Sequence, residues 1–279
     1  MISVLGDSSV LLWLAAALIA FLGARSFVEY FRRTHHEGPL RMWREWLMGT
    51  GCLVSGLWAS MVIDISAKGV AFELGYHPLK IFGTWVIGFL MMGAVVAGVT
   101  FRPRWYWQLT GAALATLVTL FIQVAVVWSI GAEPGLHWRS EPLSFALLIE
   151  FTGLVVAGRM VAGPRRGSPG DRKSRRLMAA LVLGACIVAA QELVLAGSGL
   201  DRQVVSAHAR FLPEVAITLV AGAVVPISML LMFVDQRTQQ RARASERARR
   251  RRHRQSSGAG GGESMFSDSL LVDKHPGQH

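Results

Sequence analysis

Long apolar runs, separated by short segments that hold most of the charged residues, dominate the chain. The hydrocarbon core of a bilayer is about 30 Å thick, and about 20 apolar residues of helix can cross it. We therefore predict an all-α polytopic membrane protein, a bundle of seven transmembrane helices within residues 1–236. The predicted spans are residues 8–27, 44–66, 79–100, 106–131, 143–163, 176–198 and 211–234.

The composition supports this interpretation, because apolar residues are frequent and charged residues are scarce. Hydrophobic residues make up 52% of the 279 positions and charged residues 17%, whereas a soluble domain has about 25% charged residues. The net charge of +11 comes mainly from Lys and Arg beside the apolar runs and in the C-terminal segment. We interpret this charge as a sign of membrane topology and not of nucleic-acid binding.

Most of the 29 Lys and Arg residues fall in alternate segments between the predicted spans. Basic residues are enriched on the cytoplasmic side of membrane proteins. We therefore predict that the N-terminus lies outside and that residues 27–43, 101–105, 163–175 and the C-terminal tail lie in the cytoplasm. Only an odd number of spans keeps these segments on one side, which favours seven crossings.

The C-terminal tail, residues 237–279, changes composition along its length. Residues 237–254 are rich in Arg, and we expect them to lie against anionic lipid headgroups. The Gly- and Ser-rich stretch SSGAGGGES follows, and we expect most of the tail to be disordered. Besides the lipid bilayer we expect an unidentified protein partner, whereas nucleic-acid binding by the Arg-rich stretch is the less favoured alternative.

The second, fourth and sixth predicted spans share a design. Each runs outward, carries its polar side chains toward its outer end, and is followed by an outer segment and a returning span. We predict an internal repeat in which three helix pairs follow a first helix.

Polar side chains within these spans form what we call the polar layer. Carboxylates and amides are costly in hydrocarbon, so they usually face the bundle interior and find partners there. We expect Gln123, Glu150 and Glu192 to converge inside the bundle, either as packing hydrogen bonds or as a site for a ligand or proton. The polar layer consists of Asp64, Gln123, Glu150, Gln191 and Glu192.

Each predicted outer loop carries one histidine, with carboxylates nearby in the sequence. These histidines are His77, His137 and His208. Imidazole and carboxylate groups together bind divalent transition metals, provided that the loops converge. No two of these residues have the close sequence spacing of a metal motif, so exposed loop histidines are the favoured interpretation. Met61 is a further candidate ligand by residue type.

Two stretches resemble the MHYT family of bacterial membrane sensors. Residues 56–78, GLWASMVIDISAKGVAFELGYHP, are similar to its Gly-Ile-Trp-x-Met-His segment through Trp58 and Met61, and to its Tyr-Asp-Pro segment through residues 76–78. Residues 184–197, GACIVAAQELVLAG, resemble the same motif in the third repeat of the family. The resemblance implies seven helices with three internal repeats, a location in the bacterial cell membrane and a sensory role.

The chain departs from the family at the motif histidines. Their positions fall on Met61 or Val62, near Gln123, and on Gln191. The family is proposed to bind copper through His and Met side chains and so to sense oxygen, carbon monoxide or nitric oxide. Copper needs imidazole or thioether ligands, and glutamine is a poor substitute. The resemblance therefore implies the fold and the sensory role, and we predict no copper or other cofactor.

Several activities of membrane proteins lack their required residues in this chain. A retinal-binding protein needs a lysine in its seventh helix, and residues 211–234 contain none. The predicted spans contain no histidine for a haem, and the sequence has no H-E-x-x-H motif. We predict a sensor or signalling scaffold that is not an enzyme and acts through a separate partner. A small transporter or proton/cation pathway that uses the intramembrane carboxylates, and a structural subunit of a membrane complex, remain alternatives.

Overall fold

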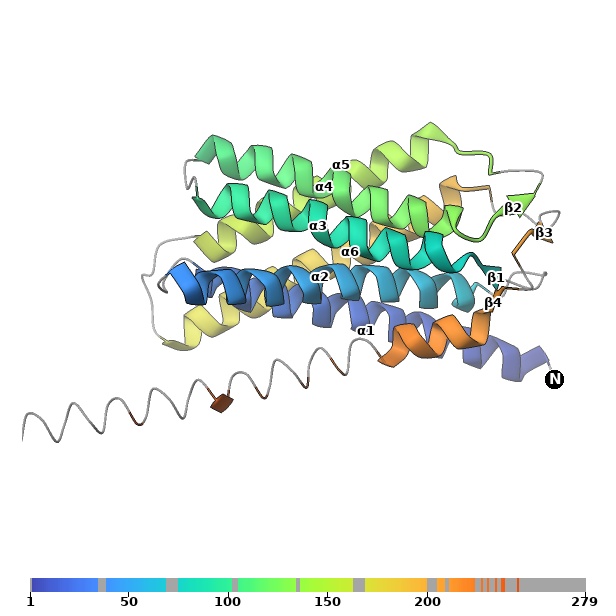
Figure 1. The fold of residues 1–279 in the computed structure, drawn as a ribbon, viewed down its shortest axis with the longest axis horizontal. Helices are drawn as coiled ribbons and strands as arrows, with labels where there is room; N and C mark the ends of the chain where they lie inside the picture. The colour runs from blue at the N-terminus through green and yellow to red at the C-terminus, as the bar shows by residue number, and fades with distance from the viewer. Residues whose placement is uncertain are drawn as a thin grey trace, which may run out of the picture. The chain divides into compact units, whose positions relative to one another are not determined.

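Long helices make up most of the chain in the computed structural model. It describes residues 2–34, 39–68, 75–101, 105–133, 136–162, 169–199, 205–208 and 211–223, and single positions beyond. The long helices are α1 (Ile2–Thr34), α2 (Pro39–Ala67), α3 (Pro78–Phe101), α4 (Trp105–Trp128), α5 (Ser140–Ala162) and α6 (Pro169–Gly197). They run alongside one another as a bundle (Figure 1).

Within the described part of the chain, six helices are long and apolar enough to cross a bilayer. Large apolar side chains such as Leu90, Leu117 and Leu148 point outward from the bundle, as expected where lipid replaces water as the solvent. The chain is therefore a polytopic helical membrane protein.

The seventh predicted span, residues 211–234, is described continuously only in its first half. A short apolar helix covers Glu214–Ala223, and most positions after it lie outside the described residues. The helix begins three residues after the predicted start, because Leu212 and Pro213 form a short strand instead. Proline favours an extended conformation in the residue before it, which explains the late start.

Residues 230–279 form a second unit of the chain. The positions described in it are helical, and they are Leu230, Val234, Arg237, Thr238 and Ser245. Most of the predicted disordered tail, including the Gly- and Ser-rich stretch, lies outside the described residues.

The helices α1 and α2 pack closely because glycines face each other between them. A Cβ atom added to Gly23 would lie 3.0 Å from the Cα atom of Gly56 and 3.0 Å from the Cys52 carbonyl oxygen. Such small residues let helix backbones approach in a membrane, where apolar burial alone does not drive association. The helix α2 is the centre of the core, since every residue from 52 to 65 is buried.

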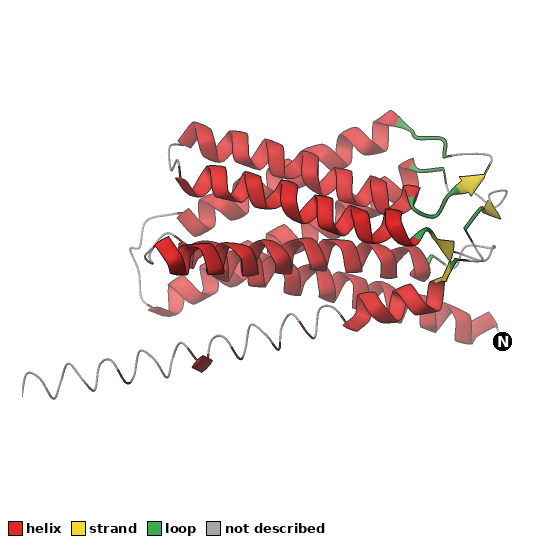
Figure 2. Cartoon of the chain, in the orientation of Figure 1, coloured by secondary structure: helices red, strands yellow, loops and turns green. Residues whose placement is uncertain are grey.

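Two small antiparallel strand pairs lie at one end of the bundle (Figure 2). The strand β1 (Gly75–Tyr76) pairs with β4 (Leu212–Pro213), and β2 (Ala132–Glu133) pairs with β3 (Val205–Ser206). The segments that follow α2, α4 and α6 therefore meet at this end, which we call the strand end. The first helix, α1, also begins at the strand end, at Ile2 (Figure 1).

The side chain of Tyr76 in β1 is fully buried. Burial, and secondarily the carboxylate of Glu214, raise the pKa of Tyr76 well above its usual range. The side chain is therefore neutral and packs as part of the core of the strand end.

Candidate functional site

A buried carboxyl group lies between α4 and α5. The Gln123 side-chain amide donates to Glu150 Oε1 at 2.6 Å, and the Thr119 hydroxyl donates to Glu150 Oε2. Thr119 and Gln123 are one turn apart, so both face α5 from the same side of α4. None of the three residues is more than 3% exposed. We call these residues the Glu150 cluster.

The Thr119 hydroxyl has a second acceptor. It also lies 2.8 Å from the Thr116 carbonyl oxygen in the preceding turn of α4, a bond that Ser and Thr commonly form within helices. One hydroxyl carries one proton, so the Thr116 carbonyl oxygen and the Glu150 carboxylate compete for the same donor.

A second polar contact joins α6 to α2. The side-chain amide of Gln191 donates to Ser60 Oγ at 2.7 Å and lies 3.3 Å from the Leu57 carbonyl oxygen. Gln191 is 1% exposed and Ser60 is fully buried. Because neighbouring helices in a membrane gain little from apolar burial, such a bond helps to fix their relative position.

A third set of polar residues lies where α2 and α6 approach the strand end. Glu192 accepts a hydrogen bond from Trp13 Nε1 at 2.7 Å and forms an ion pair with Lys68. Asp64 lies one turn before Lys68 and is 2% exposed. The Oδ1 atom of Asp64 is buried without a hydrogen-bond partner. Glu192 and Lys68 are the charged neighbours of its carboxyl group.

The polar layer is therefore divided into separate contacts. Gln123 and Glu150 converge inside the bundle as expected. The convergence expected of Glu192 with them is not found, because its carboxylate bonds to Trp13 and Lys68. Consecutive residues of a helix point about 100° apart, so Gln191 faces the interior of the bundle at Ser60 while Glu192 reaches Trp13 on α1 and Lys68 just beyond the end of α2. Met61 is fully buried in the hydrophobic core.

The partners Thr119, Lys68 and Trp13 were missed by the sequence interpretation. Thr119 precedes Gln123 by one turn, and Lys68 follows Asp64 by one turn. This spacing places each pair on one helix face and could have identified both residues. Trp13 lies on α1, far from Glu192 in the sequence, and no local pattern indicates their contact.

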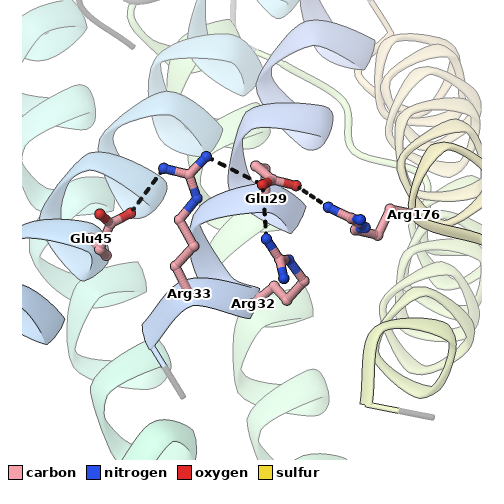
Figure 3. A network of polar contacts seen from close by, with 5 residues as sticks. All are labelled: Glu29, Arg32, Arg33, Glu45 and Arg176. Carbon is pink, nitrogen blue, oxygen red and sulfur yellow. Dashed lines mark hydrogen bonds and ion pairs between the residues drawn. The ribbon is translucent and has the colours of Figure 1, made fainter. Parts of the chain in front are cut away.

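Charged side chains from α1, α2 and α6 meet in one network (Figure 3). They lie where α1 ends and where α2 and α6 begin, which is the end of the bundle opposite the strand end. Glu29 on α1 binds Arg32 at 3.1 Å and Arg33 at 3.2 Å from the same helix, and Arg176 on α6 at 2.9 Å. Arg33 also lies 3.8 Å from Glu45 on α2. We call these residues the charged cluster. It joins α1 to the next helix, α2, and to α6, which is distant in the sequence.

Two of the three candidate outer histidines come together at the strand end. The ring centroids of His77 and His208 are 5.1 Å apart, whereas His137 lies beside Gly199. Among the described residues, no three His, Cys, Asp or Glu side chains gather as a metal-binding group. His77 and His208 thus meet as a pair.

Comparison of the chain with models of protein families, with curated proteins and with solved structures gave no match.

Proposed function

We propose that the chain is an integral membrane sensor or signalling scaffold of MHYT-like type that acts through a separate partner protein. We further propose that it lies in the bacterial cell membrane and crosses it seven times, with an internal repeat of helix pairs. The charge distribution supports an outer strand end and a cytoplasmic tail. The charged cluster, with three arginines and two carboxylates, lies at the end proposed to be cytoplasmic.

The observation that carries this proposal is that α6 has polar contacts to its neighbours at both ends. Gln191 bonds to Ser60 on α2, and Arg176 bonds to Glu29 on α1. These α6 residues are separated by roughly 22 Å along the helix, at about 1.5 Å per residue. A displacement of α6 at one end would therefore strain a specific contact at the other, which is how helix shifts transmit signals in membrane and soluble switches.

The Glu150 cluster is the proposed sensing group. A proton added to Glu150 makes it a donor, which frees the Thr119 hydroxyl for the Thr116 carbonyl oxygen alone. A small ligand that replaces the Gln123 amide would change the same bonds. The change can reach α6 because α5 packs tightly on it three residues later, where a Cβ atom on Gly153 would lie 2.6 Å from Cys186 Cβ.

Measurement of the distance between α1 and α6 at the charged end tests this coupling. Spin labels would be attached to cysteines at Arg25 and Ser174, which are exposed, after Cys52→Ala and Cys186→Ala. We expect Glu150→Gln, which keeps the shape of the side chain and cannot gain or lose a proton, to shift the distance distribution between the labels.

The matched control is Glu141→Gln, because Glu141 is exposed at the start of α5. It should leave the distribution unchanged. An identical distribution in the parent, in Glu150→Gln and across a pH titration of the parent would contradict the proposed transmission through α6.

A proton or cation pathway is the second candidate, favoured by the deep burial of the carboxyl groups of Asp64 and Glu150 within spans. Such groups often mark ion and proton routes. Reconstituted vesicles with a pH-sensitive dye inside would distinguish the candidates. Flux that Glu150→Gln abolishes would favour the pathway, and a shift in the label distance without flux would favour the sensor.

A further inference from the structure

His77 and His208 come from segments that are distant in the sequence and are joined by backbone hydrogen bonds. His77 directly follows β1, and His208 lies two residues after β3. The backbone N–H of His77 donates to the Ser129 carbonyl oxygen at 3.0 Å. The backbone N–H of His208 donates to Ser206 Oγ at 3.2 Å. Each imidazole is thus attached to a backbone with fixed contacts.

The surrounding residues hold these two segments together. The Ser206 hydroxyl lies 3.1 Å from the Gly75 carbonyl oxygen and 2.8 Å from that of Ile130, and can donate to either. Gly131 has a φ of +65°, and a Cβ atom there would lie 2.5 Å from the His208 ring. Glycine is therefore required both for the backbone conformation and for the space that His208 occupies.

The separation of the two rings matches that of two imidazoles on one metal ion. Nitrogens at about 2.0 Å from a tetrahedral zinc ion place the centroids of their rings about 5 Å apart. The observed centroid separation is 5.1 Å. Phe211 lies 5.7 Å from His77 and 5.6 Å from His208, centroid to centroid, and provides an apolar neighbour for both rings.

One nitrogen of this pair lacks the partner that a buried polar atom normally has. His77 Nδ1 is buried and has no hydrogen-bond partner, and such an atom often indicates an ion or water at the position. Tyr76 is not a candidate ligand, because successive residues of a strand point to opposite faces and its side chain is buried in the core.

We propose that His77 and His208 bind a divalent transition-metal ion of the kind that prefers imidazole, such as Zn²⁺. No third His, Cys, Asp or Glu completes the group among the described residues, so water or an external ligand takes the remaining coordination positions. The ion links the segment between α2 and α3 to the segment after α6. This site is separate from the Glu150 cluster and does not depend on the proposed sensor role.

Titration of the full-length protein with Zn²⁺ tests the site. The protein would be purified in detergent through a tag without histidine and compared with His77→Gln, His208→Gln and the matched control His137→Gln. His137 is exposed and lies outside the pair. The variants also control for zinc bound by the other histidines of the chain.

We expect wild type and His137→Gln to bind one more Zn²⁺ per chain than His77→Gln or His208→Gln. Loss of either imidazole should lower the zinc affinity of this site by at least about 100-fold. Loss of a residue that only hydrogen-bonds to a metal ligand already lowers metal affinity by about 10- to 100-fold. The double variant should lose no more zinc than each single variant. Zinc should raise the unfolding temperature of wild type and of His137→Gln, and not that of His77→Gln.

Equal zinc binding by wild type and every variant, or an equal loss in His137→Gln, would show that the histidine pair is a packing contact only. If His208→Gln does not fold, the comparison of His77→Gln with His137→Gln still decides the question. Co²⁺ provides a second measurement on wild type alone. Intense visible absorption that Zn²⁺ displaces would support a tetrahedral site, and its absence would contradict one.

Discussion

The hydrogen bond between Gln123 and Glu150 can be measured by a double-mutant cycle. Gln123 Nε2 lies 2.6 Å from Glu150 Oε1, and neither residue is more than 2% exposed. Gln123→Leu removes the donor and leaves a buried carboxyl oxygen without it. Glu150→Leu leaves the Gln123 amide without this acceptor, whereas the Thr119 hydroxyl keeps the Thr116 carbonyl oxygen. The double variant replaces the interacting pair with apolar groups of similar size.

The coupling free energy follows from the environment of the pair. In a soluble protein, a hydrogen bond contributes about 0.5–1.5 kcal/mol between neutral groups and about 1.5–3 kcal/mol to a charged group. Hydrogen bonds between helices in a membrane average about 0.6 kcal/mol and reach about 1.7 kcal/mol, because the unfolded helices also find partners. Because the contact between Gln123 and Glu150 is short and fully buried, we place it toward the upper end of the range for membrane helices. We expect a coupling of about 1–2 kcal/mol between Gln123 and Glu150.

The free energy of unfolding in mixed detergent micelles measures this coupling for wild type, both single variants and the double variant. Gln108→Leu on the same helix is the matched control, because Gln108 is exposed. Its effect should add to that of Glu150→Leu within about 0.5 kcal/mol. If the cycle through Gln123 is equally additive, the two side chains do not bond and the Glu150 cluster is not a unit.

Two further predictions concern packing and charge. Gly23→Ala should destabilise the protein by about 1–3 kcal/mol because its Cβ atom meets the backbone of α2. Gly98→Ala, where a Cβ atom would meet nothing within 4 Å, should be neutral or stabilising by up to about 1 kcal/mol. Thermal unfolding compares the two variants. Equal losses of stability would refute the close approach of α1 and α2 at Gly23. Arg176→Gln should cost no more than about 1 kcal/mol, since the ion pair with Glu29 is partly exposed. It should nevertheless change the label distance between α1 and α6, and an unchanged distance would show that this ion pair does not position α6.

The sequence was sufficient to locate the apolar helices but not their full lengths. The span predicted at residues 176–198 starts inside α6, which runs from Pro169 to Gly197. Proline is favoured in the first turn of a helix, and Asp171 there interacts favourably with the helix dipole. Hydropathy finds the part of a helix that is soluble in lipid, whereas hydrogen bonding and capping decide where it begins and ends.

The contacts of the polar residues could be predicted only in part. Gln123 and Glu150 were expected to meet, and they do. The expectation for Glu192 was wrong, because its depth in the membrane was clear from the sequence but its direction around the helix was not. That direction depends on how α6 packs against α1 and α2. At Gly184, for example, an added Cβ atom would lie 3.0 Å from the Cα atom of Phe21.

The amino-acid sequence by itself determined that the chain lies in a membrane as a set of long helices. The transfer of apolar side chains from water to lipid is a local property that adds up along each run. Only the tertiary structure decided that Thr119 also bonds to Glu150 and that Glu192 meets Trp13 and Lys68 instead. It also decided that His77 lies beside His208. These contacts join residues distant in sequence, and they depend on the packing of every helix against its neighbours.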